Sequence, residues 1–234
     1  HGGQAWQDAT VFEAVAMGIG GNNYYKNCYV DLKESCLRSE TTVKVFDQMR
    51  KLQGFTDEGS PGRDWNVATG MVIEGKAGFQ IMGDWAKGEF TAAGKVPGVD
   101  YYCAATPSNN GYLYNVDSFI FYKSSDPDKQ AGQKLLAKLM MGKNFQKVFN
   151  LYKGSIPARL DVSMDEFDKC AKTSNADIKT AGASGGLVPS FAHGMAQGNT
   201  MKAALQDIIT EHFNSDMSSV DAANALADSV LANM

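Results

Sequence analysis

The stretch 71–90 constrains the fold more than any other part of the chain. It reads MVIEGKAGFQIMGDWAKGEF. A helical pattern ends there, Gly75 and Gly78 interrupt it, and a short apolar run follows at 79–82. A short apolar run between glycines favours a buried strand over another turn of helix. We therefore expect a strand at 79–82 that stops at Gly83.

Asp84 and Trp85 follow directly, so the expected strand delivers a carboxylate and an indole to its tip. Ligands of open α/β sheets bind outside the carboxyl ends of the strands. A carboxylate accepts hydrogen bonds from hydroxyls, and an indole covers the apolar face of a ring. The pair therefore suits a hydroxylated ring. The alternative is an ordinary helix N-cap at Asp84 and a core tryptophan at Trp85, and the two residues alone do not decide.

The composition indicates a folded chain without a basic or membrane-spanning region. Its 234 residues are 44% apolar and 21% charged, which argues against disorder and allows one large domain or two small ones. The net charge of −4 argues against a nucleic-acid partner. No stretch approaches the roughly 20 apolar residues of a bilayer-spanning helix.

The chain begins with HGGQAWQDAT. This stretch has no initiator methionine, and it lacks the basic start and the apolar core of a secretory signal. A helical pattern starts almost at once. We expect that the beginning of a larger protein has been removed.

Four cysteines, Cys28, Cys36, Cys103 and Cys170, allow three disulfide connectivities. Cys28 and Cys36 share one loop, so we predict a bridge between them and a second between Cys103 and Cys170. Such bridges indicate an oxidising compartment. Four buried free thiols in a cytosolic protein are the alternative. Without a CxxC pair or a Cys/His cluster, the pattern does not favour a zinc site.

Helical patterns fill most of the chain, and the few strand patterns lie between residues 79 and 123. Helices are expected at 6–19, 39–53, from 65, from 86, and at 126–141, 145–153, 163–180, 199–213 and 219–234. Besides 79–82, strands are expected at 101–104 and 115–123, with a turn at 107–111. These strands are too few for a full parallel sheet.

Several motifs together resemble one family. The runs EGKAGFQIMGDW, NVDSF and KGSIPAR, in this order, resemble the sugar-binding proteins of bacterial ATP-binding-cassette importers. The glucose/mannose-binding branch also has counterparts of GGQAWQDATVFEAV, DQMRKL, GRDWN and the His-Gly of SFAHG. The resemblance covers the whole chain.

The resemblance implies an α/β, periplasmic-binding-protein-like fold of type II, whose two lobes close on a sugar by hinge motion. It implies a helix-rich C-terminal lobe formed by 1–82 and 123–234. Residues 83–122 would be a crossover segment that belongs to the N-terminal lobe, and most of that lobe would be absent.

The resemblance also assigns ligand-binding residues. Trp65 would stack on the sugar ring, Asp84 would bind hydroxyls and Trp85 would cover a ring face. Lys153 of the KGS run would donate to hydroxyls. The alternative is that Lys153 binds no ligand and is simply a lysine at a helix C-terminus, where the helix dipole favours a cation. His193 would line the cleft.

Three further residues complete the expected site. The Asn115 amide can donate and accept, Asp117 would face the same side of the strand, and Trp6 would lie beside the cleft. The other histidines, His1 and His212, are expected at the surface.

The implied function is a periplasmic solute-binding protein, not an enzyme. It would capture a monosaccharide, glucose, in an interlobe cleft and deliver it to the membrane permease of the importer, without metal or cofactor. The missing N-terminal lobe would be a further partner. Two alternatives are open: a glycoside hydrolase using Asp84 and Asp117 as its carboxylate pair, and an interaction or sensor module that no longer binds sugar.

Overall fold

The computed structural model describes residues 2–108 and 110–234, and the chain divides into two compact units. Unit 1 is formed by 1–83, 104–115 and 176–234, and unit 2 by 84–103 and 116–175. His1 and one residue of the turn expected at 107–111 lie outside the described residues. No helix within the described ranges is long and apolar enough to cross a membrane.

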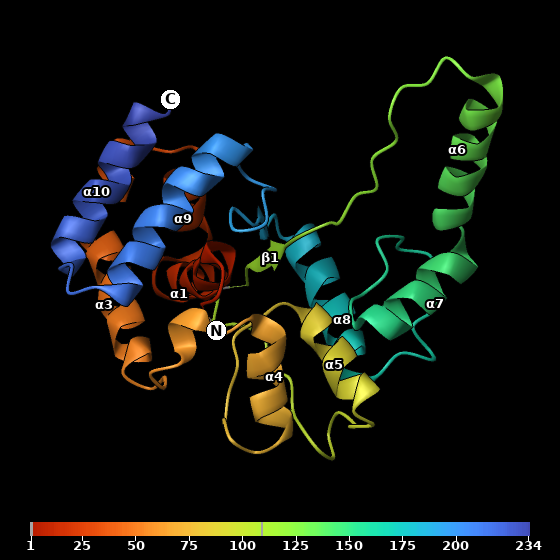
Figure 1. Ribbon diagram of the computed structural model, residues 1–234, viewed down its shortest axis with the longest axis horizontal. Helices are drawn as coiled ribbons and strands as arrows, with labels where there is room; N and C mark the ends of the chain where they lie inside the picture. The colour runs from red at the N-terminus through yellow and green to blue at the C-terminus, as the bar shows by residue number, and fades with distance from the viewer. Residues whose placement is uncertain (1, 109) are drawn as a thin grey trace. The chain divides into compact units, whose positions relative to one another are not determined.

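The core of unit 1 lies among four helices, which Figure 1 shows packed together. They are α1 (Ala5–Tyr25), α3 (Glu40–Gln53), α9 (Asn199–Asn214) and α10 (Ser219–Ala232). Phe12 of α1 packs against Phe46 of α3 with ring centroids 4.9 Å apart, and both side chains are fully buried. Burying such aromatic side chains is the main favourable term in folding.

Side-chain caps begin two of these helices, α3 and α10. Ser39 accepts a hydrogen bond from the Thr42 amide at the start of α3, and Ser218 does the same for Asp221 at the start of α10. Such caps satisfy amide groups that have no partner inside the helix. Gly21, with a φ of 70°, interrupts α1, and the helix continues beyond it to Tyr25.

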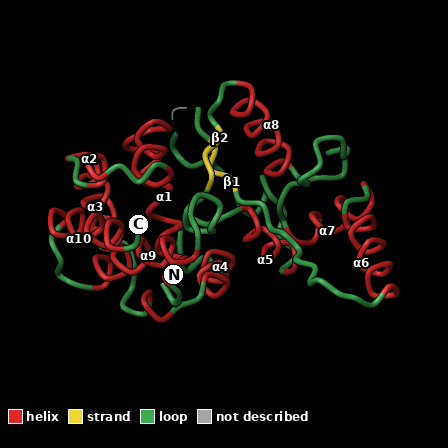
Figure 2. Tube along the Cα trace, turned by 90° about the horizontal axis from the view of Figure 1, so that it is seen from above, coloured by secondary structure: helices red, strands yellow, loops and turns green. Residues whose placement is uncertain are grey.

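Smaller elements complete unit 1. They are the π-helix η1 (Lys26–Val30), α2 (Glu34–Leu37), the 3-10 helix η2 (Ser60–Gly62), α4 (Trp65–Ile73) and two strands. Strands β1 (Tyr112–Tyr114) and β2 (Leu187–Pro189) lie side by side (Figure 2). They pair in parallel, with Leu113 opposite Val188.

Unit 2 has fewer regular elements and a small core. It contains the 3-10 helix η3 (Asp84–Ala86), α5 (Lys87–Ala92), α6 (Pro127–Met140) and α7 (Lys143–Lys153), while α8 (Lys169–Ala183) has residues in both units. The Asp126 carboxylate caps α6 by accepting from the amides of Asp128 and Lys129. The hydrophobic core cluster of unit 2 contains the buried residues Val162, Phe167 and Ala171.

Each unit contains one disulfide, and the pairs are the two predicted from the sequence. Cys28 is bonded to Cys36 in unit 1, with Cα atoms 5.1 Å apart, and Cys103 to Cys170 in unit 2, with Cα atoms 5.7 Å apart. The second bridge joins segments 67 residues apart in the sequence.

The strand predictions were wrong. Residues 79–82 form no strand and Phe79 is 96% exposed. Residues 101–104 and 115–123 are also irregular, whereas β1 lies next to the expected turn. A strand requires a neighbour to accept and donate its backbone hydrogen bonds. Within the described ranges the sheet consists of β1 and β2 alone, and neither partners these segments.

Candidate functional site

In unit 1, two of the predicted ligand residues are in contact. Trp6, near the start of α1, meets the ring of His193 at an angle of 63°, with the ring centroids 5.6 Å apart. His193 lies in a turn after β2, which the Met195 amide closes by donating to the Ser190 carbonyl at 2.8 Å. Gly194 has a φ of 73° in this turn. A left-handed conformation favours glycine, so the His-Gly sequence fits the turn.

A buried carboxylate, which sequence reasoning missed, supports this turn. Glu13 of α1 accepts hydrogen bonds from the Ser190 hydroxyl at 2.7 and 2.9 Å, from the Tyr25 hydroxyl at 3.0 Å and from the Ala192 amide at 3.3 Å. The Ser190 hydroxyl also lies 2.9 Å from Nδ1 of His193. The available signal was helical spacing, because Glu13 follows Trp6 by seven residues and so lies on the same face of α1.

Trp65 begins α4, and its surroundings are polar. Its carbonyl accepts from the Thr69 hydroxyl at 2.9 Å and from the Gln80 amide at 2.8 Å. The side chains of Thr69 and Gln80 also bond to each other at 2.8 Å. Gln7, which follows Trp6, donates to the carboxylate of Asp64 at 3.1 Å. This bond joins the backbone regions that carry the first two tryptophans of the chain.

Asn115 follows β1 directly and is partly buried. The carbonyl of Tyr114, the residue before it, accepts a hydrogen bond from the Ser190 amide at 3.0 Å. The parallel pairing of β1 and β2 therefore brings Asn115 to the start of the turn that holds His193. Asn115 was expected to begin a strand at 115–123, whereas in the structure it directly follows β1.

In unit 2, Asp84 and Trp85 form η3 and are both partly buried. Burial raises the pKa of the Asp84 carboxyl, while the cationic side chains of Lys87 and Lys153 lower it, as does the backbone amide of Ile156. The Asp84 carboxyl is therefore largely removed from water, with two cations near it. This arrangement can accept hydrogen bonds from neutral donors such as hydroxyls.

Lys153, the last residue of α7, pairs with the carboxylate of Asp117. Its ammonium also lies 5.8 Å from the centroid of the Phe149 ring. The prediction that Asp117 faces the same side of a strand as Asn115 was wrong, because 115–123 is not a strand. The ion pair with Lys153 is instead what positions Asp117.

Sequence reasoning also missed Lys87. Its ammonium is nearly buried and lies 2.8 Å from the carboxylate of Asp168, whose other oxygen accepts from the Ala171 amide at 2.8 Å. The available signal was again helical spacing, because Lys87 follows Asp84 by three residues.

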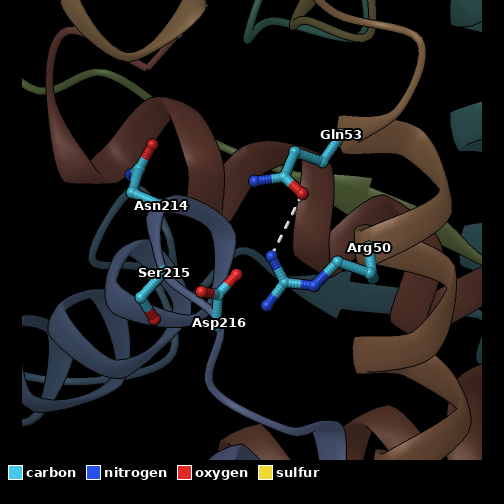
Figure 3. Close-up of a pocket in the computed structure, with 5 residues that line it drawn as sticks. All are labelled: Arg50, Gln53, Asn214, Ser215 and Asp216. Atoms are coloured by element: carbon cyan, nitrogen blue, oxygen red, sulfur yellow. Dashed lines mark hydrogen bonds between the residues drawn. The ribbon is translucent and has the colours of Figure 1, made fainter.

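A pocket elsewhere in unit 1 is lined by side chains that cap the end of a helix (Figure 3). Its lining residues are Arg50, Gln53, Asn214, Ser215 and Asp216. The Arg50 guanidinium donates to the carbonyls of His212 at 2.6 Å and Met217 at 3.0 Å, and the Gln53 amide donates to the carbonyl of Phe213. These side chains satisfy carbonyls at the C-terminus of α9, where a cation is also favourable. None of the predicted ligand residues lines it.

His212 is not at the surface, contrary to expectation. It is buried against Phe46, with ring centroids 4.8 Å apart. Burial, with a contribution from Arg50, lowers the pKa of His212 to about 4, so its ring is neutral at ordinary pH. It packs as a core residue.

The predicted ligand residues thus form one set in each unit. Unit 1 carries Trp6, Trp65, Asn115 and His193, and unit 2 carries Asp84, Trp85, Asp117 and Lys153. In the part of the chain that the structure describes, no cluster of three or more His, Cys, Asp or Glu side chains could hold a metal ion. That the two sets of residues bind a ligand stays a prediction.

Comparisons with known proteins give consistent relatives. Residues 2–180 match the family described as bacterial extracellular solute-binding proteins. A probable sugar-binding periplasmic protein of Brucella suis is 46% identical over 231 residues, which are 98% of this chain and 54% of that protein. A protein of the same description from Rhizobium meliloti is 44% identical over 231 residues, 98% of this chain and 55% of that protein. The chain therefore spans about half the length of the curated relatives it matches.

The structure is also similar to a solved structure, that of a Streptococcus pneumoniae solute-binding protein in complex with the blood group A-trisaccharide. The TM-score is 0.67 at 17% sequence identity, and the match covers 97% of this chain and 58% of the other. At this identity the likeness concerns the fold alone, and it confirms the predicted fold class.

Proposed function

Because the chain belongs to the bacterial extracellular solute-binding proteins, we propose that it captures a monosaccharide, glucose, and delivers it to the permease of an ATP-binding-cassette importer. Its relatives are named periplasmic proteins, and the periplasm is where it acts. The family consists of binding proteins, so capture involves no reaction.

The observation that carries the proposal is the position of the tryptophans. The chain has three tryptophans, and each has a hydrogen-bonding side chain beside it. Trp6 contacts His193, Trp85 follows Asp84, and Trp65 starts a helix next to Gln80. Sugars present an apolar ring face and a rim of hydroxyls, which an indole with an adjacent polar group matches.

The polar groups of unit 2 support the same ligand class. Asp84 is an acceptor in partly buried surroundings, and Lys153 is a donor that the Asp117 carboxylate holds in place. A site built to bond hydroxyls rejects analogues that lack them, because its own polar groups would lose their partners.

The variant Asp84→Ala tests this assignment. We expect it to weaken glucose binding by about 1–3 kcal/mol, as loss of a partly buried charged acceptor does. Trp85→Ala should have an effect of the same order through lost ring contact. Affinity is measured from tryptophan emission during a glucose titration, which is informative because all three tryptophans are candidate contacts.

Asp207→Ala is the matched control, because Asp207 is exposed on α9 and belongs to neither set. Unchanged glucose affinity in both Asp84→Ala and Trp85→Ala would count against the site. If no sugar binds to the wild type either, the chain is better regarded as an interaction or sensor module.

We infer that unit 2 has a second partner, namely a further lobe that corresponds to the unmatched part of the relatives. Several large apolar residues of unit 2 are each more than half exposed: Phe119, Ile120, Tyr122, Leu135 and Leu139. Large exposed apolar patches mark interaction sites on soluble proteins. The Brucella suis relative has 54% of its length matched by this chain, so its remainder is long enough to be a lobe that covers these side chains.

A further inference from the structure

A short hydrogen-bonded path connects a buried carboxylate to the ring of His193. Glu13 and Ser190 are 4% and 2% exposed and lie 177 residues apart in the sequence. The Ser190 Oγ is within 2.9 Å of both carboxylate oxygens of Glu13 and within 2.9 Å of Nδ1 of His193. All three residues belong to unit 1.

The donor count at Ser190 fixes the direction of each bond. A serine hydroxyl has one proton and two lone pairs, and an ionised carboxylate can only accept. The Ser190 proton therefore points to Glu13. The two lone pairs of Oγ then receive the backbone N–H of His193 at 3.1 Å and the ring Nδ1 at 2.9 Å. Because Oγ has no second proton to give, Nδ1 must carry one.

The other neighbours of Glu13 keep it an acceptor. The Tyr25 hydroxyl donates to it at 3.0 Å and the Ala192 amide at 3.3 Å. Burial, reinforced by the Glu13 charge, raises the pKa of Tyr25 well above its usual value, so this phenol keeps its proton. Glu13 therefore accepts from a hydroxyl, a phenol and an amide, which an ionised carboxylate can do with its two oxygens.

We propose that Glu13 and Ser190 are positioning residues that select the Nδ1–H tautomer of the uncharged His193 ring and thereby make Nε2 the accepting nitrogen. The tautomer of a histidine is set by the hydrogen bond that its other nitrogen makes. In water a neutral histidine prefers its proton on Nε2, so the protein reverses the ordinary preference. The contact with Trp6 limits rotation of the ring.

The tautomer of His193 bears on which ligands the protein selects, and this consequence rests on the proposed function. An accepting Nε2 takes a hydrogen bond from a hydroxyl and not from a carbonyl or an ether oxygen. His193 would therefore select for a ligand that donates at this position. The tautomer itself can be tested without any ligand.

The test is a long-range ¹H–¹⁵N correlation spectrum of the unliganded chain labelled in its histidine rings. Nitrogen shifts distinguish protonated from unprotonated ring nitrogens directly. The chain has three histidines, and the variant His193→Gln identifies the His193 signals. We expect His193 to show its proton on Nδ1 between pH 7 and 8. A proton on Nε2 of His193 in the wild type would overturn the proposal.

Ser190→Ala removes the accepting oxygen, and we expect the His193 proton to move to Nε2. Ser229→Ala is the control, because the Ser229 hydroxyl donates to the Ala204 carbonyl at 3.3 Å in the same unit and should leave His193 unchanged. His212 is an internal reference, since its lowered pKa of about 4 keeps it neutral throughout. A Ser190→Ala chain that folds and retains the Nδ1–H tautomer would also contradict the proposal, and if that variant fails to fold, the wild-type spectrum alone decides.

A glucose titration of the same samples separates the two proposals. In the wild type, glucose should shift the Nε2 signal of His193, and Ser190→Ala should bind glucose at least threefold more weakly than Ser229→Ala. An Nδ1–H tautomer without any response to glucose would contradict the sugar ligand, but would leave the Glu13–Ser190 assignment in place.

Discussion

Buried polar residues are concentrated on α1, and each has a specific partner. Gln7 bonds to Asp64, Asp8 accepts from the Thr210 hydroxyl at 3.0 Å, and Glu13 receives three donors. Burying a polar group costs free energy unless it is hydrogen-bonded. These partners therefore offset most of the cost, and they fix α1 beside the turn that holds His193.

Asp8 carries the clearest pH dependence of stability. Burial, opposed by the Thr210 hydroxyl, raises the pKa of Asp8 from 3.8 to about 6 in the folded chain. The folded state therefore binds a proton more tightly than the unfolded state, so stability falls as pH rises from about 4 to about 6. The shift corresponds to a loss of about 3 kcal/mol, complete above pH 6.

Asp8→Asn should remove this loss. We expect the stability of the variant relative to wild type to increase by about 2–3 kcal/mol between pH 4 and pH 7, measured by urea unfolding at both pH values. The pH effect of His212 cancels because both chains contain it. A stability difference that does not change with pH would contradict an elevated pKa at Asp8.

Sequence motifs pointed to the proposed ligand residues but not to the residues that support them. Trp6 and His193 came from a resemblance, and the structure brings them together. Glu13 and Ser190 were missed, because the partner of a buried carboxylate lies far away in the sequence and no local pattern identifies it. Helical spacing from Trp6 would have identified only the first of the two.

At the scale of elements, local signals predicted several helix ends and failed for the strands. They also failed where α1 continues to Tyr25, beyond the expected end at 19, and where α8 begins at Lys169 instead of at 163. The helices expected at 39–53 and 126–141 begin at the observed caps Ser39 and Asp126, and the helix expected at 145–153 ends at the observed cap Gly154. Caps depend on neighbouring residues, whereas a strand depends on a distant partner. β1 pairs with β2 more than 70 residues away, and this pairing could not be derived from the pattern of either segment.

Gly154, at the end of α7, is a helix boundary where the backbone conformation and the close packing both require glycine. It ends α7 with a φ of 89°, and a Cβ there would lie 2.6 Å from the Gly88 amide nitrogen and 3.0 Å from the Asp84 carbonyl oxygen. The end of α7 therefore packs directly on the backbone of η3 and α5, next to Lys153. Only a residue without a side chain fits this contact.

Gly154→Ala should destabilise the protein by several kcal/mol, because it combines a strained backbone with a clash against backbone atoms that cannot move aside. Gly98→Ala is the matched control. Gly98 is in the same unit with a φ of 88° but has open space around its Cβ position, so its cost should be only about 1–2 kcal/mol. Urea unfolding measures both, and equal costs would show that the close approach at Gly154 is absent.

At the scale of the whole molecule, unit 2 has a small core and much exposed apolar surface. The relatives are about twice as long as the matched stretch. Both observations support the proposal that a further lobe covers 119–122 and α6. Apolar side chains that stay exposed lose the free energy that burial would supply, about 25 cal/mol per Å².

A binding experiment tests this partner. The unmatched part of the Brucella suis relative, produced separately, should form a stable one-to-one complex with this chain in analytical ultracentrifugation. Charged substitutions at Ile120 and Leu139 should weaken the complex at least tenfold, whereas a charge at exposed Val220 of α10 should not. A complex that tolerates Ile120→Asp and Leu139→Asp would place the partner elsewhere.

Capture of a sugar without reaction is the central claim, and a glucose titration of the wild-type chain followed by tryptophan emission tests it most directly. We predict a saturable change with a midpoint on the order of millimolar or lower, and recovery of the glucose unchanged. Emission that stays constant up to 100-fold above that concentration (about 100 mM), with galactose and mannose giving the same result, would contradict it.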